Sequence, residues 1–507
     1  MNKRNAMKNA MYAGSFFILY TILQFINRSF FIKYLNVDYL GLNGVLTSLV
    51  GMMAVADLGI SSAINFSLYA PIKEKNSDLI QSLLLLYRKI YLIIATVVLL
   101  TSFILSFFLQ DFVDLESKIN IYIPFFLLTL NAAVSYTMAA SRSLIIANQK
   151  DRIASMSDFL GNTFVVITQI LVLIFTQNYI LYLLLRVIGT LGSNIYITYR
   201  ARNLIPGYKV KEFIPIKIPK ETISELIQNV SGNFFLRLGG IVVVGSDNLL
   251  ISKFVGITSV GIYSNYLLII QTLQSLIQQM FNAIVSTIGN FALTSTDDEG
   301  EVMYHRMQFL NFVIILGVAI GLESFISTFI YYWVGNKFIF STVTTQLLII
   351  SFFFMNYNIT SWNFTAAYGL AGHMRSVSIS EMLLNLVFSI MLAKYTHLGI
   401  NAIILGTILS TILTVGWMNA YVIFKYGFNR SVKSYLVNYL KDIIIFVFLM
   451  LISYFLKKQF TNINLILQSI SIFVVLLICM LLLVYFVYRK NDEFKYWKCQ
   501  VLWILKR

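Results

Sequence analysis

Charged residues are scarce in this chain of 507 residues, of which only 12% are Asp, Glu, Lys or Arg. Soluble domains carry about 25% charged residues, whereas this chain is 58% hydrophobic with a mean hydropathy of +0.77. This composition excludes a soluble protein and indicates an all-α polytopic membrane protein. Proline is also rare, with five residues, and no low-complexity tract is present, which leaves little room for a disordered domain.

Cysteine and histidine are too few for the chemistry that they usually support. Cys479 lies in an apolar run and Cys499 in the C-terminal tail, so they form neither a disulfide framework nor a metal-binding spacing. The three histidines, His305, His373 and His397, are expected in loops, far apart in sequence. We therefore predict no metal, no cofactor and no catalytic residue.

Long apolar runs divide the chain into about fourteen segments that are long enough to cross a bilayer. These predicted spans are 10–34, 41–70, 90–109, 119–147, 153–176, 180–199, 223–250, 260–291, 309–334, 345–370, 377–396, 400–424, 442–456 and 464–488. The first run resembles a signal peptide but has no convincing cleavage site, so we expect it to remain as a span. The loops on the outer side are too short to hold a catalytic domain.

Basic residues are distributed unevenly between the two sides of the predicted membrane. Of the 38 Lys and Arg residues, 27 lie in segments on one side and 7 on the other. Because basic loops stay in the cytoplasm, this asymmetry places both termini there. It also accounts for most of the net charge of +16, which therefore gives no indication of nucleic-acid binding.

A basic loop that contains three prolines separates the first six spans from the rest. The predicted domains are an N-lobe (1–200), a cytoplasmic linker (201–222), a C-lobe (223–424), two further spans (425–488) and a tail (489–507). At an offset of 220 residues, Gly41 matches Gly261 and Ala63-Ile64 matches Ala283-Ile284. We interpret these few identities as a repeat of two parallel six-helix lobes, although chance could supply some of them.

The tail is basic and rich in aromatic residues from Glu493 to Arg507. Such a segment fits an interfacial helix on the anionic inner leaflet. Packing against the rest of the protein is an equally good interpretation.

Polar residues recur at helical spacing in nine of the predicted spans. The second half carries two such stripes, with Asn229, Asn233 and Arg237 in one span and Gln271, Gln274, Gln278 and Asn282 in the next. Residues at these intervals share one helix face. Polar faces can simply join helices, but their number favours a hydrated cavity between the lobes. Spans 13 and 14 lack such a face and are expected to face lipid.

Four arginines lie inside the predicted spans: Arg28, Arg142, Arg186 and Arg237. A guanidinium stays charged near pH 7, and placing one at the bilayer centre costs about 2.5–3.5 kcal/mol. These cations therefore need a partner or an anionic ligand, and Arg binds phosphate through a two-pronged fork. We expect Arg28 and Arg237 in particular to contact the substrate, with Asn233 and the three glutamines lining the same cavity.

Four acids within or beside the spans offer an alternative explanation for the arginines: Asp57, Asp158, Asp247 and Glu323. Each acid is either a counter-charge or an ion-coupling site. Arg142 lies near the inner boundary, where an ion pair with Asp158 or snorkelling explains it as well as substrate binding does. Asp57, at mid-span on a polar face, is the preferred coupling residue.

Several motifs resemble those of one transporter family, the Wzx-type polysaccharide flippases. They include Tyr39-Leu-Gly-Leu-Asn-Gly44, Asp57-Leu-Gly-Ile60, Ser246-Asp-Asn-Leu-Leu-Ile-Ser252 and Gly261-Ile-Tyr-Ser-Asn-Tyr266. The resemblance covers most of residues 1–425 and places the chain in the MOP superfamily, beside lipid II flippases and MATE drug exporters. Asn36 is a departure, because the family often has glycine there.

This resemblance implies transport by alternating access through a cationic cavity. The substrate would be an undecaprenyl-diphosphate-linked oligosaccharide, moved from the inner to the outer leaflet of the bacterial cytoplasmic membrane for surface polysaccharide synthesis. Membrane lipids, a polysaccharide polymerase and glycosyltransferases are the expected partners, and coupling to a proton or sodium gradient or to the membrane potential is expected. The alternatives are a lipid II flippase and a MATE-type cation or drug antiporter. A membrane polymerase or ligase would need larger outer loops.

Overall fold

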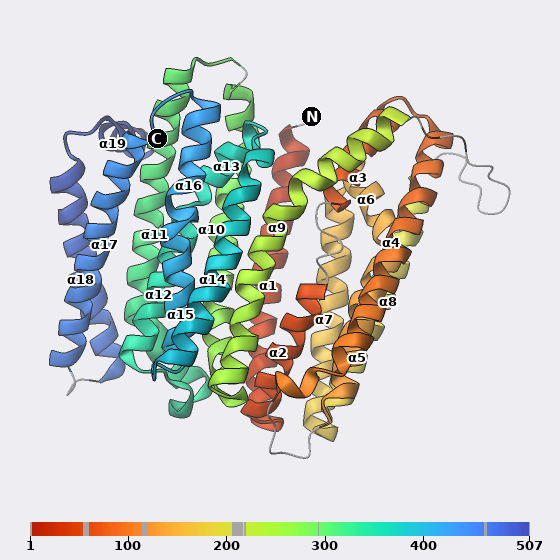
Figure 1. Cartoon of the computed structure of the whole chain (residues 1–507), viewed down its shortest axis with the longest axis horizontal. Coiled ribbons are helices and arrows are strands. Elements are labelled where there is room, and N and C mark those ends of the chain that lie inside the picture. Colours follow the sequence, from red (N-terminus) through yellow and green to blue (C-terminus); the bar gives the residue numbers. More distant parts are fainter. Residues whose placement is uncertain are drawn as a thin grey trace. The chain divides into compact units, whose positions relative to one another are not determined.

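The computed structural model describes residues 3–53, 60–113, 120–204, 216, 218, 220–292, 294–460 and 464–505. Within these ranges, the side chains of residues 3–13, 61–63, 151, 220–222, 224–237, 283, 286, 504 and 505 lie outside the described set. All regular elements in the described ranges are helical (Figure 1).

The described chain forms two compact units, Met1–Gly261 and Ile262–Arg507. The helices of the first unit are α1 (Lys3–Tyr34), α2 (Val37–Met53), α3 (Ile60–Lys73), α4 (Ser77–Ser106), α5 (Tyr122–Thr137), α6 (Ala139–Ala147), α7 (Asp151–Thr176), α8 (Tyr179–Arg202) and α9 (Lys220–Phe254), with the first turn of α10 (Ile257–Ala292). α7 packs between α1 and α8, α5 packs against α4 and α8, and α9 packs on α2 and α3. The predicted lobes at 1–200 and 223–424 remain a prediction.

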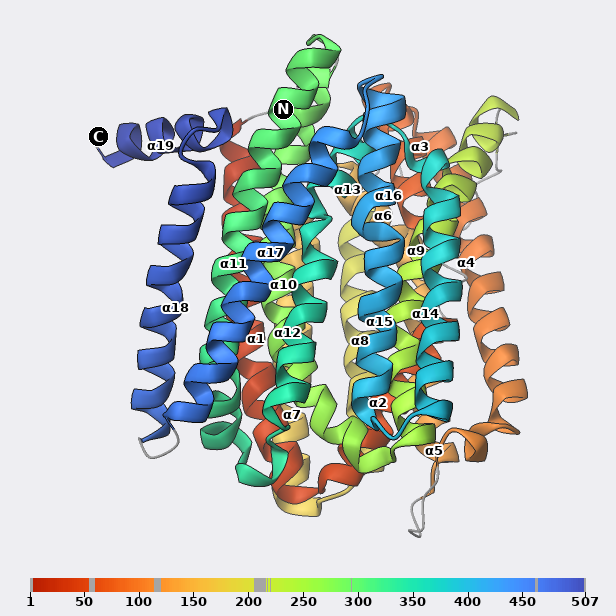
Figure 2. The same cartoon turned by 60° about the vertical axis from the view of Figure 1, so that its left-hand side comes forward.

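The second unit contains the rest of α10 and nine further α-helices. These are α11 (Asp297–Val334), α12 (Thr342–Tyr357), α13 (Ile359–Ala367), α14 (Arg375–Tyr395), α15 (Ile400–Leu413), α16 (Val415–Val422), α17 (Lys433–Gln459), α18 (Leu465–Tyr488) and α19 (Asp492–Leu505). α14 packs on α15, and α11 packs on α12 and α18. α19 lies across the end of α18 (Figure 2) and contacts α11.

Ten helices in the described residues are long and apolar enough to cross a membrane, or eleven if α5 and α6, which meet at a 45° bend, form one span. The chain is therefore an all-α, multi-pass membrane protein. The other three of the fourteen predicted spans fall on α2 with α3, on α9, and on α12 with α13. α12 and α13 are separated by a break at Asn358, and α9 carries Asn229, Asn233 and Arg237, which lowers its apolarity.

Several helices extend well beyond the apolar segments that mark the spans in the sequence. α11 has 38 residues, a length of about 57 Å, whereas the hydrocarbon core of a bilayer is only about 30 Å thick. Its acidic first turn is held by a capping box, in which Thr296 and Glu299 bond to each other's backbone N–H groups. The prediction that all three histidines lie in loops is consequently wrong for His305, which lies in α11.

Two glycines allow α2 to approach the first turn of α10 closely. A Cβ atom at Gly41 would lie 2.0 Å from the backbone oxygen of Ile257, and one at Gly261 would lie 2.5 Å from that of Val37. Beside them, the Thr258 hydroxyl donates to a carboxylate oxygen of Asp38 at 2.7 Å. This contact therefore requires glycine at both positions.

Replacing Gly41 with alanine is expected to destabilise the first unit by about 1–3 kcal/mol, the usual cost of overpacking. The neighbour is backbone, which cannot rotate away as a side chain can. Thermal unfolding of the purified protein would measure the effect. Gly51→Ala is the matched control, because Gly51 lies on the same helix with nothing within 4 Å of its Cβ position. An unchanged melting temperature for Gly41→Ala would contradict the close approach.

Candidate functional site

A polar cluster joins α1, α7 and α8 in the first unit. The Asn27 side-chain amide donates to the Tyr182 hydroxyl at 2.9 Å and to the Gln169 side-chain oxygen at 3.3 Å. Gln169 is buried and donates to the Tyr182 backbone oxygen at 2.9 Å. These bonds hold the Tyr182 hydroxyl in place, because Asn27, which donates to it, is itself bonded to Gln169, and Gln169 is bonded to the Tyr182 backbone.

Two of the four predicted arginines lie at this cluster. Arg28, on α1, and Arg186, on α8, are both within electrostatic range of the Tyr182 hydroxyl. Arg28 is half-buried and Arg186 is exposed. Two positive charges near one phenol hydroxyl make this region electropositive, which suits a phosphate or another oxyanion.

Aromatic rings form one side of the same cluster. Tyr179 lies 5.2 Å from Tyr39 and 5.9 Å from Phe31, measured between ring centroids. Its hydroxyl donates to the Asn43 side-chain oxygen at 3.1 Å, and Arg186 is within electrostatic range. Tyr179 and Tyr182 are not among the site residues predicted from the sequence. They precede Arg186 by seven and four residues and therefore share its helix face.

Arg142 and Asp158 form an ion pair between α6 and α7. The pair is bidentate: one guanidinium nitrogen lies 3.0 Å from Oδ1 and the other contacts Oδ2. Both side chains are more than a third exposed. Of the alternatives for Arg142, the structure therefore contains the ion pair, which leaves Asp158 as its counter-charge.

The polar stripes of α5 and α8 meet each other. The Thr190 hydroxyl donates to the Asn131 side-chain oxygen at 2.7 Å, and the Asn194 amide donates to the Val134 backbone oxygen at 2.9 Å. These bonds join helix to helix, as polar residues in membrane spans often do. At these positions the stripes therefore join helices.

Apart from Glu323, the other predicted site residues lie on α9 and α10 or outside the described residues. On α10, Gln271 and Gln278 are exposed and Gln274 is half-buried, so one face of this helix carries accessible amides. Asp247, on α9, is buried. The side chains of Asn233 and Arg237, and the whole of Asp57, lie outside the described residues.

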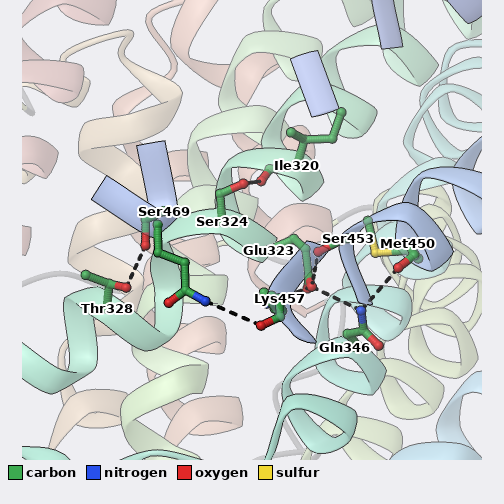
Figure 3. A network of polar contacts seen from close by, with 10 residues as sticks. Ile320, Glu323, Ser324, Thr328, Gln346, Met450, Ser453, Lys457 and Ser469 are labelled. Carbon is green, nitrogen blue, oxygen red and sulfur yellow. Dashed lines mark hydrogen bonds and ion pairs between the residues drawn. The ribbon is translucent and has the colours of Figure 1, made fainter. Parts of the chain in front are cut away.

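Glu323 is a counter-charge in the second unit. Its buried carboxylate lies 2.7 Å from the Lys457 ammonium, and the same oxygen accepts from Ser453 at 2.7 Å and from Gln346 at 3.1 Å (Figure 3). Lys457 is one of the seven basic residues that the sequence places in outer loops, but it lies in α17, which continues to Gln459. This network connects α11, α12 and α17.

The prediction that span 13 lacks a polar face is also wrong. Asp442, Ser453 and Lys457 are spaced by 11 and 4 residues along α17, which places them on one side of the helix. Asp442 is buried and accepts hydrogen bonds from the hydroxyls of Tyr357, at 2.6 Å, and Tyr488. The buried face of α17 thus binds α12 and α18.

The tail forms α19 and packs on α11. The Trp497 indole N–H donates to the Arg306 backbone oxygen at 2.8 Å, and the Arg306 guanidinium lies 4.2 Å from the centre of the Tyr496 ring. Val501, Leu502 and Trp503 are exposed at the far end of the helix. Of the two interpretations of the tail, packing on the protein therefore holds for its first half.

No protein-family model and no curated protein matches the chain. It is similar, however, to solved transporters. An inward-facing multidrug resistance MATE family transporter of the MOP superfamily matches at a TM-score of 0.65 and 13% identity, over 82% of this chain and 98% of that one. Lipid II flippase MurJ, in an inward closed conformation, matches at 0.64 and 16%, over 94% and 99%. This chain has the MOP transporter fold.

An outward-facing MATE transporter of the MOP superfamily matches less closely, at a TM-score of 0.54 and 14% identity. The sequence resemblance and these structures agree on the fold. At these identities the likeness concerns the fold alone.

Proposed function

We propose that this protein is a flippase for undecaprenyl-diphosphate-linked oligosaccharide. It would carry repeat units from the inner to the outer leaflet of the bacterial cytoplasmic membrane, by alternating access, for surface polysaccharide synthesis. The observation that carries this proposal is the polar cluster of Asn27, Gln169 and Tyr182, which has Arg28 and Arg186 within electrostatic range. The diphosphate is the part of the substrate that two guanidinium groups would bind, and the neighbouring amides and aromatic rings suit the sugars.

The charge at this site favours an anionic substrate over a cationic drug. Like charges repel, so a site with two arginines would disfavour the cations that a MATE-type antiporter carries. The likeness to lipid II flippase MurJ extends over 94% of this chain, against 82% for the MATE transporters. This extent supports a lipid-linked substrate and keeps lipid II itself as the second candidate.

We propose further that the chain contains two related six-helix lobes and fourteen spans, with both termini in the cytoplasm. Positions 220 residues apart behave alike: Asn36 and Gly256 both have positive φ, at 99° and 117°, just before α2 and α10. Asp38 and Gly41 contact the first turn of α10, where their counterparts Thr258 and Gly261 lie. Contact between equivalent positions is what a two-fold axis between repeats would produce.

Energy for transport would come from a proton or sodium gradient or from the membrane potential, with Asp57 as the coupling residue. A polysaccharide polymerase and glycosyltransferases would be the partners that use and supply the substrate. These assignments follow the sequence resemblance and the helical spacing of Asp57 with other polar residues in the sequence.

The test is to compare the lipid-linked oligosaccharide pool, and its distribution between leaflets, in cells with and without this protein. We expect cells without it to accumulate the oligosaccharide on the inner leaflet and to lose surface polymer. Accumulation of lipid II instead would identify the second candidate. Unchanged pools together with altered sensitivity to cationic drugs would contradict both and favour the antiporter.

A further inference from the structure

The last turn of α18 exposes apolar side chains at the end that leads into the tail. Tyr485, Phe486 and Val487 are all exposed. α18 has 24 residues, a length of about 36 Å, and is one of the helices that can cross a membrane. A bilayer is about 40–45 Å thick including its headgroup regions, so both ends of this helix lie within it. Lipid therefore extends to the level at which α19 begins.

α19 is held at this level by the chain and by two contacts. Residues 489–491 link α18 directly to α19, and Figure 2 shows α19 lying across the end of α18. The Phe494 ring lies 6.1 Å from the Tyr485 ring of α18, measured between centroids. The Trp497 indole N–H donates to the Arg306 backbone oxygen of α11 at 2.8 Å. The Phe494 side of α19 is thus the side that faces the lipid around α18.

α19 has an apolar side and a polar side. Val501 and Leu502 follow Phe494 by seven and eight residues, so all three lie on one side of the helix. Val501 is 53% exposed and Leu502 is 46% exposed. The other side contributes Asp492 and Cys499 to a groove of about 580 Å³ that α19 forms with α11. The apolar side therefore continues the exposed apolar surface of α18, whereas the polar side faces the protein and water.

Positive charge accompanies the apolar side of α19. Lys498 follows Phe494 by four residues, which places it beside the apolar side chains. It is exposed and has no ion-pair partner among the described residues. Arg489 and Lys490, in the link from α18, are exposed as well. Cations at the level of the headgroups attract anionic lipids, and a lysine can extend its charged end past apolar neighbours to reach them.

We propose that α19 is an interfacial helix that binds anionic lipid beside α18. Its Phe494, Val501 and Leu502 side chains rest on acyl chains, and Lys498 contacts headgroup phosphates, as in other amphipathic helices that lie in the membrane plane. In the proposed orientation this is the inner leaflet. A cytosolic protein or a second copy of the chain would have to displace the lipid that covers the end of α18. The inference depends on α18 as a span and not on the transported substrate.

Quenching by nitroxide-labelled lipids tests the position of α19 in the full-length protein, with one copy in each nanodisc. A fluorophore is attached at position 501 through Val501→Cys, in a background where Cys479→Ala and Cys499→Ser leave no other thiol. Native Cys499, labelled in Cys479→Ala alone, is the matched control, because it is exposed and lies two residues away on the other side of the helix. We expect acyl-chain nitroxides to quench position 501 at least about twofold more than position 499.

The same labelled protein tests the charge of the lipid. Labelled phosphatidylglycerol, which is anionic, should quench position 501 about twofold more than labelled phosphatidylcholine at the same mole fraction. Lys498→Gln should reduce this difference. Lys458→Gln is the matched control, because Lys458 is also exposed but lies at the end of α17 that leads to the start of α18. It should leave the difference unchanged.

Three results would overturn the inference. Equal quenching at positions 501 and 499 would mean that the apolar side does not rest on lipid. Equal quenching by the two lipids, or a preference for phosphatidylglycerol that Lys498→Gln leaves unchanged, would exclude anionic-lipid binding through Lys498. Efficient disulfide formation between two Val501→Cys copies in native membranes would show that this side of α19 belongs to a dimer instead.

Discussion

Replacing Arg28 with alanine is expected to reduce transport of the proposed lipid-linked oligosaccharide by at least about thirtyfold, and replacing the more exposed Arg186 should reduce it less. Loss of one member of a buried charged contact typically costs about 2–5 kcal/mol, and the diphosphate would lose one of its two guanidinium partners near Tyr182. Membrane abundance should stay close to that of the wild type, because Asn27 and Gln169 still join the helices at this point. Surface polysaccharide and leaflet distribution are the measurements.

The lysine variants distinguish charge from geometry at the same two positions. Lysine keeps the charge but cannot form the planar two-pronged contact with phosphate, so partial rescue indicates that charge dominates, and poor rescue indicates bidentate contact. Arg200→Ala is the matched control. Arg200 is exposed on the same helix as Arg186 and its guanidinium contacts only Tyr196 among the bonds described for it. Full transport by both alanine variants at equal protein levels would reject the substrate role.

The sequence predicts the class of fold because a bilayer constrains sequence strongly. Apolar runs and the distribution of basic residues depend on distance from the membrane and not on which helix packs against which. Helix ends were harder to predict. α17 begins at Lys433 and ends at Gln459, whereas its apolar segment covers only 442–456, because a helix does not have to end where the hydrocarbon ends.

The contacts between distant segments were predicted in part. Arg142 and Asp158 are 16 residues apart on consecutive helices, so their proximity follows from the order of the spans. Glu323 and Lys457 are far apart in sequence and belong to α11 and α17, which meet only because of the tertiary fold. The proximity of Arg28 and Arg186 to Tyr182 could not be predicted for the same reason. Helical spacing gives the helix face on which each arginine lies, but not which residue of another helix lies next to it.

The repeat illustrates a similar limit. Matching Gly41 with Gly261 in the sequence indicates that the two positions are related, but gives no sign that α2 and the first turn of α10 touch there. The close approach itself selects glycine, since a Cβ at either position would overlap a backbone oxygen. Direct contact alone therefore accounts for glycine at both positions, and the repeat stays a prediction.

The second large effect is expected at the buried ion pair. Replacing Lys457 with methionine should destabilise the protein by about 3–5 kcal/mol, because it leaves the fully buried carboxylate of Glu323 without its cation. The double variant Glu323→Gln with Lys457→Met removes both charges, and such replacements are often neutral or stabilising. We therefore expect it to recover most of the lost stability. Thermal unfolding of the purified protein in one detergent gives the four corners of a double-mutant cycle.

Lys458→Met is the control for this cycle, because Lys458 is the next residue on α17 but is exposed. It should change the melting temperature little, since surface charges contribute about 0–1 kcal/mol. The double-mutant cycle also shows whether the ion pair itself, or only the packing of the buried side chains, contributes to stability. If the two single substitutions simply add, Glu323 and Lys457 do not stabilise each other and the network of α11, α12 and α17 depends on packing alone. If the double variant is more stable than either single one, the Lys457 ammonium is what makes the buried carboxylate of Glu323 tolerable.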